Sequence, residues 1–217
     1  LQNNIQSINT SGSVLRQAVL RNQPDVILLQ EVWKPEQEIV INDYLKPVLK
    51  LRQYGEIGGG VGIICKKHVK QVVLKEYEVD DLEAVWVDVM VGGLRSVVGS
   101  VYIPPGKIEK LDRLDQVITI ILQSHERILI GMDANSRSSL WDESCCGVDA
   151  CRKSIRMGSR LEDLLMKHGL QVHNSGQATY VTELHSSAPD ITVSKGLHSV
   201  SWRIIDDELK SPHEGIL

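Results

Sequence analysis

The sequence lacks any apolar run long enough to span a membrane, and its first residues lack the pattern of a signal peptide. It also lacks an excess of positive charge, since 24 Lys and Arg stand against 28 Asp and Glu, which gives a net charge of −4. The pI of about 6.0 is not that of a protein that holds nucleic acid through bulk charge. A local basic surface around a site remains compatible with this composition.

Cysteine is scarce, and its four residues form no recognisable zinc motif. Cys65 lies in a strand-like run where a buried thiol is expected, whereas Cys145, Cys146 and Cys151 share one polar segment. The adjacent pair does not match the usual zinc spacings, and no second ligand pair is evident. A disulfide or metal site in this segment stays open, but we expect reduced thiols in an intracellular, reducing environment.

The chain also lacks internal repeats and low-complexity tracts. Its 217 residues, 42% of them hydrophobic, suffice for one large domain or two small ones with a sizeable core. It does not begin with methionine, and an expected strand starts almost at once. We therefore expect residues 1–217 to form a single domain of a longer polypeptide.

Helices and strands are expected from apolar periodicity. The expected helices are residues 14–22, a part of 35–51 around Tyr44 to Leu49, 111–122, and 160–168 with Gly169 as its cap. The expected strands are residues 4–8, 26–31, 61–65, 72–79, 84–91, 96–103, 127–132, 170–173, 179–182, 190–193 and 199–205. A tight hairpin is expected at Gly92-Gly93, and a long polar loop at 136–159. The pattern predicts an α/β fold in which helices cover a sandwich of two sheets.

The stretch Ile128 to Ser136 is the first candidate for a site. An apolar strand-type run reaches Gly131 and then presents Asp133 and Asn135. Because side chains alternate along a strand, these two are expected on the same side of its carboxyl end. A carboxylate beside a carboxamide can handle a proton together with a phosphoryl oxygen or a metal. The alternative is a solvated turn after a buried strand, since Asp, Asn and Gly are common turn residues.

Other strand ends or loops also display polar groups, namely Asn4, Glu31, Tyr102, Asp190 and His213. Each alone is equally consistent with a solvated end or a structural side chain. Together with Asp133 they form a chemically complete set. Asn4 and Glu31 offer oxygen atoms, which Mg²⁺ prefers. A His oriented by an Asp suits a charged phosphoryl transition state, and Asp133 can take a proton from water.

Six short motifs follow one another along the chain: Asn4-Ile5-Gln6-Ser7, Gln30-Glu31, Val101-Tyr102-Ile103-Pro104-Pro105, Gly131-Met132-Asp133-Ala134-Asn135, Ser187-Ala188-Pro189-Asp190-Ile191 and Ser211-Pro212-His213. In this order and rough spacing they resemble the endonuclease/exonuclease/phosphatase superfamily nearly from end to end. The glycine-rich run at 58–64 and Leu140-Trp141 after Asp133-Ala134-Asn135 are most similar to the apurinic/apyrimidinic-type endonuclease domain of non-LTR (LINE-type) retrotransposons. The resemblance implies a four-layered α/β sandwich of the DNase I-like type, with two mixed sheets flanked by helices.

The resemblance also implies roles for the matching residues. Asn4 and Glu31 would bind Mg²⁺, for which Mn²⁺ would substitute. Glu31, Tyr102, Asp133, Asn135, Asp190 and His213 would be the catalytic residues. Tyr102 and His213 would contact the scissile phosphate, Asp190 would hold His213, and Asn135 would orient Asp133 and the phosphate. Asp133 would either activate the attacking water or protonate the leaving oxygen.

The partner implied is double-stranded DNA. Arg137, Thr179, Ser187 and Ser211 would lie at the DNA-binding surface, with a target-selecting hairpin loop at about residues 182–186. The cations weighed as DNA-facing, against the alternative of solvated faces, are Lys66, Lys67, His68, Lys70, Arg137, Arg152, Lys153, Arg156 and Arg160, of which Arg137 is favoured. A reverse-transcriptase domain would adjoin the chain, which would be monomeric in isolation, nuclear and not attached to a membrane.

The implied activity is Mg²⁺-dependent nicking of one DNA strand to leave a 3′-hydroxyl that primes reverse transcription. The alternatives are abasic-site repair, hydrolysis of a small phosphoester by a phosphatase or phospholipase, and a non-catalytic domain that binds DNA or protein. One departure keeps the last alternative open. The superfamily motif Ser-Asp-His is here Ser211-Pro212-His213, and proline supplies no side-chain oxygen.

Overall fold

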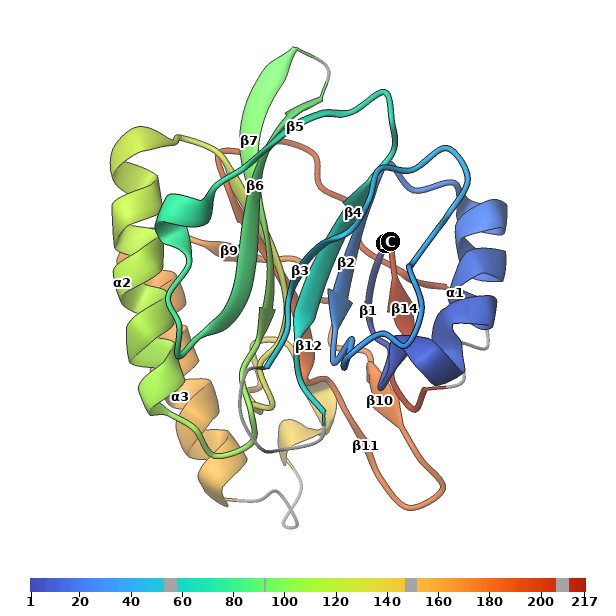
Figure 1. The fold of residues 1–217 in the computed structure, drawn as a ribbon. Helices are drawn as coiled ribbons and strands as arrows, with labels where there is room; N and C mark the ends of the chain where they lie inside the picture. The colour runs from blue at the N-terminus through green and yellow to red at the C-terminus, as the bar shows by residue number, and fades with distance from the viewer. Residues whose placement is uncertain (53–57, 92, 147–151, 206–210) are drawn as a thin grey trace.

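Two six-stranded mixed sheets pack face to face in the computed structural model, which describes residues 1–52, 58–91, 93–146, 152–205 and 211–217 (Figure 1). The first sheet has the order β13 (Ile204–Ile205), β14 (Gly215–Ile216), β1 (Gln2–Asn4), β2 (Val26–Gln30), β4 (Val61–Cys65), β3 (Val48–Lys50). The second has the order β5 (Lys70–Val73), β6 (Glu83–Val91), β7 (Leu94–Tyr102), β8 (Ile128–Asp133), β12 (Asp190–Lys195), β9 (Gln171–Val172). A separate hairpin pairs β10 (Tyr180–Val181) with β11 (Ser186–Ser187).

Helices cover the outer face of each sheet, as Figure 1 shows. Helix α1 (Ile8–Asn22) lies on the first sheet, and α2 (Glu109–Ser124) and α3 (Arg152–His168) lie side by side on the second. Two short 3₁₀ helices, η1 (Lys75–Tyr77) and η2 (Glu143–Cys146), complete the elements. The predicted four-layered α/β sandwich is thus confirmed. No helix in the described part of the chain is both long and apolar enough to cross a membrane.

The core is layered in the same way. Leu28, Ile63, Val85 and Val87 belong to the cluster between the two sheets. A second cluster packs α1 on the first sheet, and the largest one packs α2 and α3 on the second. In the largest cluster, the fully buried Trp86 lies across from Gly99 of β7, where a Cβ atom would overlap the indole ring. Successive side chains of β6 therefore point alternately into the core between the two sheets and into the core beneath α2 and α3.

Several sequence-based boundaries are corrected. The first strand is residues 2–4 and not 4–8, because the chain turns at Gln6 and Ser7, which have positive φ angles. The helix expected around Tyr44 to Leu49 is wrong, since residues 48–50 form β3 against β4. Pro47 explains this difference, because proline disfavours a helical conformation in the residue before it and cannot donate a helical hydrogen bond.

Helix α3 begins at Arg152, eight residues before the predicted start at Arg160, so the polar loop is shorter than predicted. Its first turns carry mostly polar residues and give little apolar periodicity. The expected strand at 72–79 is confined to β5, with η1 following it. The strands β11 and β14 were not predicted, since two residues cannot display a period.

The cysteines give no support for a metal centre within the described residues. Cys65 is buried and free, as expected, and Cys145 is half-buried. Cys151 lies outside the described residues, as does Gly92 of the expected hairpin turn. The strands on either side of that turn, β6 and β7, pair as predicted.

Candidate active site

Three of the predicted residues form one row across the second sheet. Tyr102 ends β7, Asp133 ends β8, and Asp190 begins β12; Asp133 is the direct partner of both of the others in the strand register. Residues directly opposite each other in adjacent strands project to the same face of a sheet. The row faces the first sheet, in which β1 and β2 end at Asn4 and Gln30, just before Glu31. The site therefore lies at the shared end of both sheets.

Asn4 connects the two sheets. Its buried amide nitrogen donates hydrogen bonds to Glu31 Oε1 at 3.0 Å and to Asp133 Oδ2 at 2.8 Å. Its amide oxygen, expected to bind metal, accepts the Gln6 N–H at 3.1 Å. Asn4 thus holds two carboxylates next to each other, and in this arrangement the oxygens that face the site are those of Glu31 and Asp133.

Asn135 reaches the site by a turn and not by strand alternation. Strand β8 ends at Asp133, and Asn135 has a left-handed backbone with φ of 44°. Its N–H donates to Asp133 Oδ1 at 3.0 Å, while its side-chain nitrogen donates to the Ile103 carbonyl at 3.0 Å. Asp133 therefore accepts one hydrogen bond on each oxygen, which fixes the orientation of its carboxylate.

Asp190 and His213 form a buried pair. Nδ1 of His213 lies 2.8 Å from Oδ2 of Asp190, which also accepts from the Thr179 hydroxyl at 2.8 Å. Oδ1 of Asp190 is buried without a hydrogen-bond partner. The ring of His213 makes an edge contact with Tyr180 at 4.8 Å between centroids. The pair is thus held from the hairpin side, and one carboxylate oxygen has unused bonding capacity.

Burial and mutual charge shift the ionisation of the site. Burial, followed by the charge of Asp190, raises the pKa of Asp133 to about 7. Burial by itself would lower the pKa of His213, but the charge and hydrogen bond of Asp190 raise it to about 9. Burial and the charges of Glu31 and Asp133 raise the pKa of Tyr102. At neutral pH, His213 is therefore a cation and Tyr102 a hydrogen-bond donor.

The donor set fits a hard divalent cation. Ligand atoms of Asp133, Asp190 and His213 all lie within 4.8 Å of one another, and no other such group of His, Cys, Asp or Glu occurs among the described residues. Because the protonated ring of His213 offers no lone pair to a metal, the carboxylates are the candidate ligands of this group. Glu31 adds a half-buried carboxylate beside Asp133, and the unpartnered Asp190 Oδ1 is a buried oxygen without a donor. Carboxylate oxygens are the ligands that Mg²⁺ prefers.

Three residues predicted at the DNA surface are engaged by the protein itself. Thr179 is fully buried against Asp190, so it supports that carboxylate. The Ser211 hydroxyl donates to the Asn4 carbonyl at 2.7 Å and accepts the His213 N–H at 3.2 Å. Arg137 pairs with Asp142 at 3.0 Å and donates to the Ser144 hydroxyl at 2.7 Å. Ser187 is half-buried in the hairpin, opposite Tyr180.

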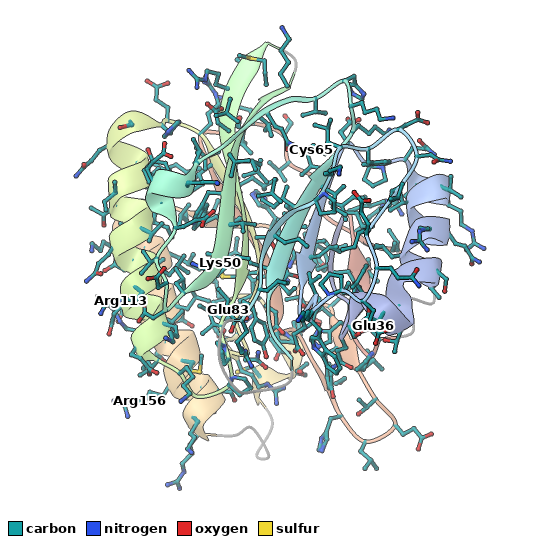
Figure 2. All side chains as sticks on the ribbon, in the orientation of Figure 1. Glu36, Lys50, Cys65, Glu83, Arg113 and Arg156 are labelled. Carbon is teal, nitrogen blue, oxygen red and sulfur yellow. The ribbon has the colours of Figure 1, made fainter. Side chains whose placement is uncertain are left out.

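The basic clusters divide by position. Lys66 contacts the Gln23 carbonyl and Asp25, at the start of β2 and hence at the end of the sheet away from Glu31, so its cluster is not beside the site. The first turn of α3 lies near the site, because the Arg137 N–H donates to the Ser154 carbonyl at 3.0 Å. Arg156 extends from this end of α3 (Figure 2).

One residue missed from the sequence is Glu83, the direct partner of Tyr102 in the register of β6 and β7. It extends the row of Tyr102, Asp133 and Asp190 by one strand. The sequence did indicate this position. A two-residue hairpin turn at 92–93, as predicted, pairs residue 91 with residue 94, and the same register pairs residue 83 with residue 102. The predicted strand began at Ala84, which left Glu83 outside it.

Two family models match the sequence. The one described as the endonuclease/exonuclease/phosphatase family matches residues 4–144, and the one described as endonuclease-reverse transcriptase matches residues 96–217. The search of curated proteins gave no match.

Solved structures share the fold. The endonuclease domain of TRAS1, a telomere-specific non-LTR retrotransposon, has a TM-score of 0.76 and 18% identity, and the match covers 99% of this chain and 94% of that chain. The AP endonuclease LMAP from Leishmania major has a TM-score of 0.73 and 10% identity, covering 95% and 81%. The 3′-5′ exonuclease NExo from Neisseria meningitidis has a TM-score of 0.66 and 14% identity, covering 99% and 97%.

Proposed function

The chain belongs to the endonuclease/exonuclease/phosphatase family, whose members hydrolyse phosphate esters, and from that premise we propose that it is a Mg²⁺-dependent endonuclease that nicks one strand of double-stranded DNA. The nick leaves a 3′-hydroxyl, which primes reverse transcription in the nucleus by an adjoining domain of the same polypeptide. The match to the model described as endonuclease-reverse transcriptase and the likeness to the TRAS1 domain support this choice within the family.

One observation carries the proposal: a single amide, that of Asn4, brings together carboxylates from two different sheets. Like charges at this separation repel each other in a buried site, so the arrangement is unfavourable for stability. It becomes favourable when a cation is bound there. The buried Asp190–His213 pair adds a positive charge on the opposite side.

The residues divide the chemistry of phosphodiester hydrolysis among them. Glu31, held by Asn4, would hold Mg²⁺, which when bound withdraws charge from the phosphate. Asp133, with a pKa of about 7, exchanges a proton with the attacking water or the leaving oxygen. The protonated His213 and the hydroxyl of Tyr102 stabilise the negative charge that develops on the phosphate oxygens. Asn135 keeps the carboxylate of Asp133 in its orientation.

DNA would extend from this site across the hairpin of β10 and β11. Ser187 lies on that hairpin, whose turn is closed by a 2.8 Å hydrogen bond from Thr182 N–H to the His185 carbonyl. Arg137 and the first turn of α3 border the site on the other side. With a net charge of −4, the chain by itself should bind DNA weakly and with strong salt dependence.

The chemistry of the DNA ends at the nick distinguishes this function from abasic-site repair. Duplex oligonucleotides with and without an abasic site are incubated with the protein and Mg²⁺, and the products are offered to a DNA polymerase. We expect the intact duplex to be nicked and the new end to be extended without further processing, since a 3′-hydroxyl is a primer. Cleavage confined to the abasic duplex, or ends that need a phosphatase before extension, would contradict the proposal.

A further inference from the structure

Glu83 makes contacts that join the second sheet to the first. Its Oε1 accepts two hydrogen bonds from the Arg52 guanidinium, at 2.9 Å from Nε and 2.7 Å from Nη2. Its Oε2 accepts the N–H of Gly60, which precedes β4 of the other sheet. The Arg52 and Glu83 side chains are only 20% and 15% exposed, so this pair is largely shielded from solvent. Figure 2 shows Glu83 at the start of β6.

The glycine segment that Glu83 holds is bonded directly to the chain beside Glu31. The carbonyl of Gly60 accepts the Val32 N–H at 3.1 Å, and that of Gly59 accepts the Trp33 N–H at 2.9 Å. The indole of Trp33 in turn donates to Glu31 Oε2 at 3.4 Å. Glu31 itself has a left-handed backbone with φ of 49°, which its neighbours must maintain. The glycine segment therefore holds the backbone on the C-terminal side of Glu31 in place.

Gly59 shows how closely these groups approach. Its φ of 73° lies in the left-handed region, and a Cβ atom there would overlap both the Glu83 carboxylate and the Arg52 guanidinium. Arg52 also lies over the ring of Tyr102, at 5.8 Å from its centroid. The Arg52–Glu83 ion pair thus contacts two parts of the molecule at the candidate site: the glycine segment that bonds to the chain beside Glu31, and the ring of Tyr102.

We propose that Glu83 and Arg52 are positioning residues for the phosphodiesterase reaction, acting as a clamp that sets the orientation of Glu31 and Tyr102 for metal and phosphate. The inference rests on the proposed function of the site. Neither residue touches the reacting atoms. Glu83 acts through the backbone of Gly60, and Arg52 acts through the face of the Tyr102 ring.

An ion pair that only stabilises the fold could have the same hydrogen-bond geometry without affecting metal binding or nicking. The chain offers such a pair as a control: Arg160 donates to Asp112 from Nε at 3.0 Å and from Nη2 at 2.7 Å, between α3 and α2 and away from the site. Glu83→Gln removes the charge but keeps an oxygen for Gly60. Asp112→Asn makes the matched change in the control pair.

The test measures Mn²⁺ binding by electron paramagnetic resonance, the Mg²⁺ concentration for half-maximal plasmid nicking, and Tm. We expect Glu83→Gln to weaken Mn²⁺ binding and to raise the Mg²⁺ concentration for half-maximal nicking, each by about 10-fold. Substitution of a residue that supports a metal ligand commonly has an effect of this size. Asp112→Asn should stay within about twofold of the parent in both, since it lowers stability alone. Equal effects of the two substitutions on metal dependence would overturn the clamp.

Two further outcomes are decisive. If Glu83→Gln fails to fold, Arg52→Gln replaces it, because the Glu83 bond to Gly60 then remains. Since Arg52 acts through the Tyr102 ring, a nicking rate that Arg52→Gln lowers no more than Asp112→Asn does overturns the proposal. If the parent protein never nicks DNA, the proposed function fails, whereas Mn²⁺ binding still decides the clamp: it is supported by weaker binding in Glu83→Gln and overturned by equal binding.

Discussion

Asp133 and Asp190 are both almost fully buried, and the charge of Asp190 raises the free energy of the ionised form of Asp133. Buried carboxylates are stable only where hydrogen bonds or opposite charges compensate them. The compensation here consists of the Asn4 amide, the Asn135 N–H, the Thr179 hydroxyl and the cationic ring of His213. The polar groups of the site therefore depend on each other, and single substitutions should act on stability and activity in different directions.

His213 should make stability depend on pH. Its folded-state pKa of about 9 exceeds the ordinary value of 6.5, so the folded state favours the cation. This contribution is fully present below about pH 6.5 and is lost as pH rises through about 9. We expect the metal-free protein to be more stable than His213→Gln at low pH, by on the order of 2 kcal/mol, and this difference to shrink across that window. Chemical denaturation of both proteins across the window measures it, and a difference that stays constant would contradict the assignment.

Pro212 is the residue at which the chain departs from the superfamily motif. Its carbonyl accepts the Val181 N–H at 2.8 Å, so its backbone holds the hairpin beside His213 while its ring offers no oxygen. Pro212→Asp should raise the nicking rate at limiting Mg²⁺ by roughly threefold to 10-fold, because it adds a carboxylate next to the site. Pro212→Ala is the control, since it relaxes the backbone without adding charge. Equal rates in the two variants would show that this position is irrelevant to catalysis.

At the scale of elements, long periodic segments were predictable and short ones were not. Helix α2 and strands β2, β4, β6, β7 and β8 lie within two residues of their predicted positions, whereas α1 ends at the predicted Asn22 but begins at Ile8, six residues before the predicted Val14. Their apolar periods are strong because each is buried on at least one face. Strand β11 is defined only by its hairpin pairing with β10, and β14 only by its pairing with β13 and the distant β1. The start of α3 was hidden because its first turns bury only Met157 and Gly158, which are too few to show an apolar period.

That packing gives a prediction for two helical glycines. A Cβ atom at Gly158 of α3 would overlap the carbonyl of Arg137, whereas one at Gly12 of α1 would make ordinary contacts with Ile8 at 3.7 Å. Gly158→Ala should lower the unfolding free energy by about 1–3 kcal/mol through overpacking, although alanine favours helix. Gly12→Ala should raise it by about 0.5–1 kcal/mol. Urea denaturation of both variants decides this, and effects of the same sign would contradict the packing of α3 on the loop after Asn135.

At the scale of the molecule, the candidate site is a property of two sheets and belongs to neither alone. Asn4 and Glu31 come from the first sheet, and Tyr102, Asp133 and Asp190 from the second. The sequence motifs placed these residues at strand ends, and this much could be predicted. Which atom of each faces the site could not, because it depends on register and packing between sheets. The amide nitrogen of Asn4, and not its oxygen, faces the carboxylates for this reason.

The net charge of the molecule follows from the sequence, but the positions of the charged side chains on the fold could not be predicted from it. The cluster around Lys66 lies at the end of the sheets away from Glu31, and Arg160 is paired with Asp112. Arg52 and Arg137, which border the candidate site, are both engaged by acidic residues. Binding to DNA by this chain should therefore depend on few contacts and on the bound cation.

The most direct test of the central claim is the conversion of supercoiled plasmid by the purified chain. With Mg²⁺, the parent protein should produce the open-circular form before any linear form, and EDTA should abolish this. Asp133→Asn should reduce the rate by at least about 100-fold while leaving Tm unchanged or higher, because it removes one of two repelling buried carboxylates. Absence of nicking by the parent protein, or equal nicking by Asp133→Asn, would contradict the account.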